Sequence, residues 1–270
     1  KVKLYVDDAT LAAAGSFRRT ADRVAQSTDF VVNSLEELGL EVSAKKSVVV
    51  ASSKALADAV TAKLAVLQVA AADHAKLLGV GTNAGRTRCV QVIKTRLKAT
   101  QRRAPRVQVL RRLGVSGAAW VRSAGVPSLY GLDAVGLGDT MLLKARRTMQ
   151  RAMSAPGAGK HLDASFWAAD AHGARTDPSF AAHTAPIKAW AMATWQQWEP
   201  RPTLQAIWAA ACNTLNATQH VWANVAGPAA AAVASLQRLG WSVNPDDARV
   251  VADDLGEQHD FALDSPLAVA

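Results

Sequence analysis

Residues 4–8 read Leu-Tyr-Val-Asp-Asp, an apolar stretch that leads directly into two acidic residues. Apolar and polar side chains alternate from Val2 to Asp7, which is the period of a β-strand, and residues 9–12 can run back as the second strand of a hairpin. Two carboxylates at such a turn supply the oxygen ligands that Mg²⁺ prefers. Aspartate also favours turns by bonding to its own backbone, so the pair alone fits an ordinary turn as well.

A helix pattern and a second strand pattern follow this turn. Apolar residues recur at spacings of three and four from residue 16 to residue 38, which predicts an amphipathic helix with Ser16 as its cap. Gly39 stands where a left-handed residue ends a helix. Residues 40–47 then read Leu-Glu-Val-Ser-Ala-Lys-Lys-Ser and lead into an apolar strand at residues 48–51.

This order of elements resembles the palm domain of reverse transcriptases. Tyr5-Val6-Asp7-Asp8 is similar to motif C of that family, the metal-binding turn. The helix, the turn at Gly39 and Lys45-Lys46-Ser47 are similar to motif D. Lys76-Leu77-Leu78-Gly79-Val80 is similar to motif E, the primer grip. The nearest subclass is that of non-LTR retrotransposon polymerases, although many of these carry Ala where this chain has Val6.

The resemblance implies a catalytic role for three residues. Asp7 and Asp8 would bind Mg²⁺ or Mn²⁺, with Asp8 the weaker contributor, because divalent ions carry the phosphoryl transfer in this family. Lys46 would lie near the nucleoside triphosphate and assist the departure of pyrophosphate, with Lys45 as its competitor for that role. A solvated pair of loop lysines fits the same two residues.

The resemblance also implies contacts with nucleic acid. Tyr5, Lys76 and Gly79 would lie at the bound strands, and the partners would be an RNA template, a DNA primer and a deoxynucleoside triphosphate. The alternative for residues 76–80 is an ordinary strand followed by a glycine turn.

The family carries another metal-binding Asp on an earlier palm strand, and fingers that grip template and nucleotide. Both precede motif C, whereas this sequence begins at Lys1. We therefore expect a fragment of a longer polymerase with an incomplete metal site and no polymerase activity on its own, because a two-metal centre requires carboxylates from both strands.

Composition points to a polyanionic partner inside the cell. The 270 residues carry a formal net charge of +9 and a sequence pI near 9.9, which suits nucleic acid first and an acidic membrane surface second. Cys89 and Cys212 form neither a disulfide framework nor a zinc pattern. No secretory signal or membrane-spanning apolar run is seen, so we expect a cytoplasmic or nuclear protein without a membrane partner.

The positive charge is concentrated between residues 86 and 112, where no acidic residue occurs. The basic residues are Arg86, Arg88, Lys94, Arg96, Lys98, Arg102, Arg103, Arg106, Arg111 and Arg112. An apolar stripe runs beside them, and Pro105 is expected to split or kink the helix. The resemblance makes this region the thumb, with Arg96, Lys98, Arg102, Arg103 and Arg106 at the nucleic-acid backbone. A basic solvated helix face is the alternative.

The second half of the chain has no catalytic motif that we can identify. Residues 154–161 imitate a phosphate-binding loop but lack its first Gly and its final Ser or Thr, so they predict a linker. One helical face carries Ile187, Trp190, Thr194, Trp195 and Trp198, and this stripe is expected to pack between helices at about 185–198 and 203–224. Residues 240–270 turn acidic and fit a solvated surface.

The expected fold class is α+β. We predict a partial palm at residues 1–83, with one small antiparallel sheet (residues 1–12, 47–51 and 76–82) on helices 16–38 and 54–67. A basic helical thumb would follow at 84–154 and a helical, Trp-containing accessory region at 155–270. The competing interpretations are a non-catalytic nucleic-acid-binding module derived from such an element, and a structural helical protein whose start resembles a palm by chance.

Overall fold

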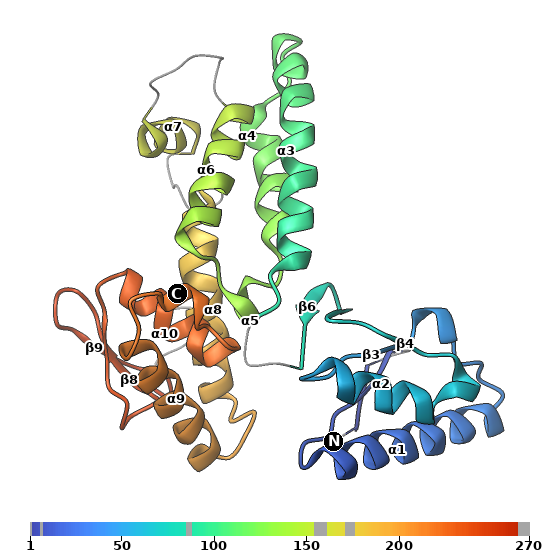
Figure 1. Ribbon diagram of the computed structural model, residues 1–270. Helices are drawn as coiled ribbons and strands as arrows, with labels where there is room; N and C mark the ends of the chain where they lie inside the picture. Colours follow the sequence, from blue (N-terminus) through green and yellow to red (C-terminus); the bar gives the residue numbers. More distant parts are fainter. Residues whose placement is uncertain (1, 6–7, 85–87, 154–160, 171–175, 264–270) are drawn as a thin grey trace. The chain divides into compact units, whose positions relative to one another are not determined.

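The computed structural model describes residues 2–5, 8–84, 88–153, 161–170 and 176–263, with the backbone alone at residues 2–5 and 8 (Figure 1). The chain is 61% helical, and its sheets have two or three strands, so the α+β prediction is confirmed at this level. Two compact units form: Lys1–Ala75 with Thr82–Arg86, and Lys76–Gly81 with Thr87–Ala270.

The first unit contains two helices and two small sheets. Its elements are β1 (Val2–Tyr5), β2 (Asp8–Leu11), α1 (Phe17–Glu37), η1 (Ala44–Lys46), β3 (Val48–Val49), α2 (Lys54–Lys63), η2 (Ala65–Leu67) and β4 (Ala70–Ala71). Helices α1 and α2 pack through Ala21, Ala25, Val60 and Leu64, which are all buried. The predicted ends of α1 agree with the structure: the amide of Gly39 (φ 75°) bonds to the carbonyl of Glu36 at 2.9 Å, as expected of a left-handed cap.

The single antiparallel sheet predicted for the first 83 residues is wrong. β1 and β2 form an antiparallel hairpin, β3 pairs with β4 in parallel, and β5 (Ala75–Leu77) pairs with β6 (Val80–Thr82) in a third, separate sheet. The parallel pair arises because α2 lies between β3 and β4, and a helical crossover returns the chain in the same direction. Strand β4 was not predicted, since two alanines carry no strand signal.

The second unit begins with most of the β5–β6 hairpin and is otherwise mainly helical. Its further elements are α3 (Gln91–Arg112), α4 (Gly117–Trp120), η3 (Val121–Gly125), η4 (Val126–Leu129), α5 (Leu132–Val135), α6 (Asp139–Met153), α7 (Leu162–Ala169), α8 (Pro178–Trp195), α9 (Arg201–Asn216), η5 (Val221–Ala223), α10 (Pro228–Arg238), β7 (Ser242–Val243), β8 (Val250–Ala252) and β9 (Gln258–Asp260). The last three strands form one antiparallel sheet.

The first core of this unit lies between α3 and α6. Ile93, Leu97 and Val107 on α3 face Ala145 and Met149 on α6, and all five are buried. The helix α3 runs unbroken through its proline, so the predicted split is wrong. The proline side chain is exposed.

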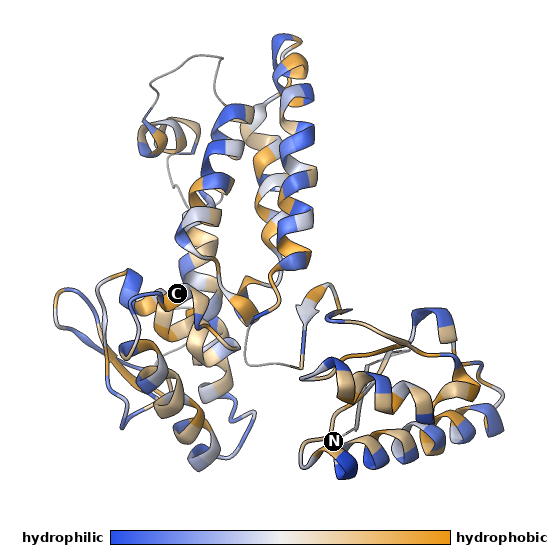
Figure 2. Ribbon diagram, viewed as in Figure 1, coloured by the Kyte–Doolittle hydropathy of each residue, from blue (hydrophilic) through white to orange (hydrophobic). Residues whose placement is uncertain are grey.

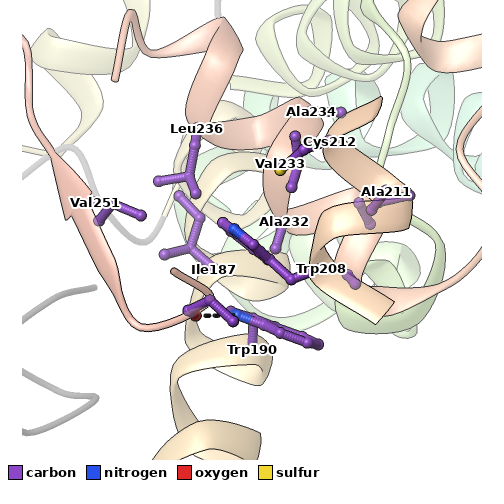
Figure 3. Close-up of a cluster of buried hydrophobic side chains, with 14 of the residues drawn as sticks. Ile187, Trp190, Trp208, Ala211, Cys212, Ala232, Val233, Ala234, Leu236 and Val251 are labelled. Carbon is purple, nitrogen blue, oxygen red and sulfur yellow. Dashed lines mark hydrogen bonds between the residues drawn. The ribbon is translucent and has the colours of Figure 1, made fainter. Parts of the chain in front are cut away.

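The second core contains the buried tryptophans Trp190 and Trp208. Trp190 on α8 and Trp208 on α9 stack with ring centroids 5.2 Å apart, and both are buried (Figure 3). Each indole N–H donates to a backbone carbonyl, Trp190 to Ala248 at 3.0 Å and Trp208 to Asn244 at 2.9 Å. Helix α10 completes this core with residues 229–236 buried on every side, as expected of a helix that is apolar all round.

The predicted stripe is correct for Ile187, Trp190 and Thr194, which are buried, and wrong for Trp195 and Trp198. Trp190 is buried, whereas Trp195 and Trp198 are 44% and 59% exposed. The helix ends at Trp195, and Gln197 adopts a left-handed conformation with φ of 50°. Helical spacing therefore no longer places Trp198 on the buried face.

Two arginines join the two cores at one indole ring. The guanidinium carbons of Arg88 and Arg238 lie 5.2 Å and 4.1 Å from a ring centroid of Trp222. Arg88 also donates to the carbonyl of Val135 at 2.9 Å, and Arg238 pairs with Asp139 at 2.8 Å. Burial, and then the neighbouring Arg238, lower the pKa of Arg88 to about 10. These two cations are therefore structural, packed against an aromatic face.

Candidate nucleic-acid interface

Helix α3 presents a row of cations opposite its buried face. Lys94, Lys98, Arg102 and Arg106 recur every four residues, and all four side chains are exposed. Residues four apart lie one above the other on a helix, and each step rises about 6 Å, so the row spans about 18 Å. In Figure 2, much of α3 is coloured as hydrophilic, with hydrophobic residues between the hydrophilic ones.

This row lies in a long segment without acidic residues. Between Asp73 and Asp133 the sequence contains no Asp or Glu. In the part of the chain that the structure describes, no carboxylate forms an ion pair with any of the four row residues. The positive charge of the row is therefore not neutralised within the described protein.

Other basic residues of the unit are occupied in holding the fold together. Arg146 on α6 is bidentate to Asp177, with Nε at 3.0 Å and Nη2 at 2.7 Å from the two carboxylate oxygens, and it also pairs with Asp163. Asp177 in turn caps α8, because its carboxylate accepts from the amide of Ser179 at 2.8 Å. Paired arginines such as Arg146 are poor candidates for phosphate binding, whereas the row residues are good ones.

Arg96 joins the predicted primer-grip hairpin to α3. Its Nη2 donates to the carbonyl of Gly79 at 2.7 Å, and its Nη1 donates to the carbonyl of Tyr130 at 2.9 Å. The Arg96 guanidinium thereby links a segment 17 residues before it in the sequence to one 34 residues after it. The predicted nucleic-acid residues Gly79 and Arg96 are thus in direct contact, with Arg96 half-buried rather than free.

The hairpin turn requires an unusual backbone. Leu78 and Gly79 have φ of 47° and 86°, and two successive positive φ values are the pattern of a type I′ turn. A Cβ atom at Gly79 would lie 3.0 Å from Nη2 of Arg96 and 3.2 Å from Cε1 of Tyr130. A side chain at this position would be strained by the positive φ and would displace Arg96 or Tyr130 slightly, so glycine suits both the turn and the close approach.

The remaining predicted contact residues of this unit are exposed. Lys76 lies on β5, and Arg103 lies on α3 seven residues after Arg96, which places it about two turns along the same side of the helix. Together with the row, they are positive charges that a nucleic-acid backbone could contact.

The structure gives less detail around the predicted catalytic residues. Asp7 lies outside the described residues. Tyr5 and Asp8, whose backbones alone are described, form the last antiparallel pair of the β1–β2 hairpin, as the strand pattern predicted. Lys46 lies exposed in η1, next to the equally exposed Lys45. The assignment of Mg²⁺ to Asp7 and Asp8 therefore stays a prediction from the motif.

Among the described residues, one other group has the composition of a metal site. Asp253, Glu257 and His259 offer ligand atoms within 4.8 Å of one another between β8 and β9. The Asp253 carboxylate already accepts from the amides of Leu255 and Glu257, both at 2.9 Å, and lies 3.3 Å from the His259 ring. These hydrogen bonds stabilise the turn between β8 and β9, which explains why the three side chains lie together. We assign no metal to the group.

The sequence patterns missed Tyr130. Its side chain is 58% exposed and lies against the hairpin turn and Arg96. Its position inside the segment without acidic residues is the one signal that could have found it, since an aromatic residue among cations is typical of nucleic-acid binding.

No protein-family model, curated protein or solved structure matches this chain. Across the described residues, every helix is too short or too polar to cross a lipid bilayer.

Proposed function

We propose that the second unit binds the sugar–phosphate backbone of nucleic acid through the cationic row on α3. The observation that carries this proposal is the row itself: four exposed cations, Lys94, Lys98, Arg102 and Arg106, without carboxylate partners in the described residues. Neutralising phosphates with Lys and Arg releases counterions, which is the main source of sequence-independent affinity for nucleic acid.

We further propose that the chain is part of a reverse transcriptase of the non-LTR retrotransposon type, and that the bound nucleic acid is an RNA template with a DNA primer. The support is the order of three motif-like segments, at residues 5–8, 39–47 and 76–80, followed by the basic helix. In this proposal Asp7 and Asp8 bind Mg²⁺ or Mn²⁺, and Lys46 lies near the triphosphate. The alternative is a nucleic-acid-binding module of the same origin in which the Asp pair no longer binds metal.

A charge-reversal experiment tests the backbone-binding proposal. Changing Arg102, Arg103 and Arg106 to Glu should weaken binding by a similar factor for duplexes of different sequence, because phosphate contacts carry no sequence information. Fluorescence anisotropy with several labelled duplexes measures this. An unchanged affinity, or a loss confined to one sequence, would contradict the proposal.

Iron-mediated cleavage tests whether Asp7 binds a metal ion. It thereby distinguishes the reverse-transcriptase proposal from the non-catalytic nucleic-acid-binding module. Fe²⁺ occupies carboxylate sites that bind Mg²⁺ and, with ascorbate and peroxide, cuts the nearby backbone. With template–primer and nucleotide present, we expect cleavage near Asp7 that excess Mg²⁺ suppresses and Asp7→Asn removes. Asp253→Asn, at the other acidic group, is the matched control and should leave this cleavage unchanged. Cleavage that persists in Asp7→Asn would favour the module.

A further inference from the structure

Tyr130 is an exposed aromatic residue that Arg96 contacts at both its ring and its backbone carbonyl. It lies directly after η4, with a side chain that is 58% exposed. The guanidinium carbon of Arg96 lies 5.6 Å from its ring centroid, and the same guanidinium bonds to the Tyr130 carbonyl at 2.9 Å. The other bond of Arg96, to Gly79, ties ring, helix and hairpin turn together.

Arg96 contacts the Tyr130 ring from one side, and the residue is otherwise largely exposed. Arg96 is itself immobilised by two hydrogen bonds to backbone carbonyls. An aromatic side chain that is already ordered loses little conformational entropy when a ligand stacks on it.

Arg96 lies against the Tyr130 ring, and the sequence before Tyr130 carries no acidic residue back to Asp73. The nearest acidic residue is Asp133, which is exposed three residues further on. Trp120, another aromatic residue of the acid-free segment, is half-buried against the first core. Among the described residues, no cation lies over the rings of Trp167 and Trp198, which are also exposed. Tyr130 is therefore an exposed aromatic residue that a cation of α3 contacts directly.

We propose that Tyr130 stacks on an uncovered base face of bound nucleic acid, either an unpaired base or the end of a duplex, while the cations of α3 hold the adjacent backbone. This inference rests on the proposed function. Aromatic stacking suits this role because every base has a π-face, so it adds affinity without sequence preference. Leu78, which is 46% exposed in the positive-φ turn beside Gly79, would border the same site.

The test uses the full chain and single-stranded oligothymidine in which one nucleotide at a time is abasic. Wild type should lose about tenfold in affinity when the stacked base is missing. Tyr130→Ala should bind the intact strand about tenfold more weakly and should lose no further affinity at an abasic nucleotide, a loss that we call the abasic penalty. Tyr130→Phe should behave as wild type. Trp198→Ala, another exposed aromatic residue, is the matched control and should keep the penalty.

Two further variants separate this inference from the proposed function and from misfolding. The quadruple variant Lys94→Gln, Lys98→Gln, Arg102→Gln and Arg106→Gln should weaken intact and abasic strands equally and retain the penalty. Arg96→Met keeps the Tyr130 ring but removes the arginine that contacts it. This variant should reduce the abasic penalty without abolishing binding.

The outcomes are distinguishable because each variant removes one kind of contact. If Tyr130→Ala folds as judged by its unfolding midpoint and keeps both affinity and penalty, the stacking role is overturned while backbone binding stands. If wild type binds a template–primer duplex but none of the single strands, the stacking role fails while backbone binding stands; if it binds neither, both proposals fail.

Discussion

The quadruple variant that replaces Lys94, Lys98, Arg102 and Arg106 by glutamine is expected to bind a template–primer duplex more weakly by roughly 10²-fold at about 0.1 M salt. The reason is electrostatic: each phosphate contact releases condensed counterions, and the row supplies four exposed cations with no carboxylate partner among the described residues. Glutamine is polar, uncharged and a good helix former, so the helix and its core should remain intact. Fluorescence anisotropy with a labelled duplex measures the loss.

A matched variant controls for net charge. Changing Arg18, Arg19, Arg23 and Lys54 to glutamine removes the same charge from exposed positions of the first unit. Its affinity should change far less than that of the row variant. Equal losses in the two variants would mean that overall charge, rather than the row, determines binding.

Trp208→Ala is expected to lower the free energy of unfolding by about 3–5 kcal/mol, the range for deleting a buried aromatic side chain. Trp208 is fully buried and stacks on Trp190, so the truncation leaves a cavity in the second core. It also leaves the carbonyl of Asn244 without its indole partner. Chemical denaturation followed by circular dichroism measures the change.

Trp198→Ala is the matched control for this prediction. Its side chain is 59% exposed, so the change in unfolding free energy should stay below about 1 kcal/mol. A similar loss in both variants would contradict the assignment of Trp208, rather than Trp198, to the core.

Periodic patterns predicted the elements that depend on local sequence. The helix α1 and the β1–β2 hairpin occur where the spacing of apolar residues placed them. The left-handed residue at Gly39 also follows from local chemistry. The acid-free basic segment was visible in the sequence, and the structure shows which of its cations are exposed.

Contacts between distant segments were not predictable in this way. Arg96 resembled its basic neighbours in sequence, yet it bonds to the carbonyls of Gly79 and Tyr130. Arg146 is likewise occupied by Asp163 and Asp177. Periodicity specifies which face of a helix is buried, but it does not specify which side chain on the border of that face finds a partner.

The dependence of template–primer affinity on salt tests the central claim most directly. If α3 holds the phosphate backbone, a plot of log K against log salt for the wild-type chain should have a slope of about −4 or steeper, and the quadruple variant should be flatter by about 3 to 4. A wild-type slope near zero, or the same slope in both proteins, would contradict the account.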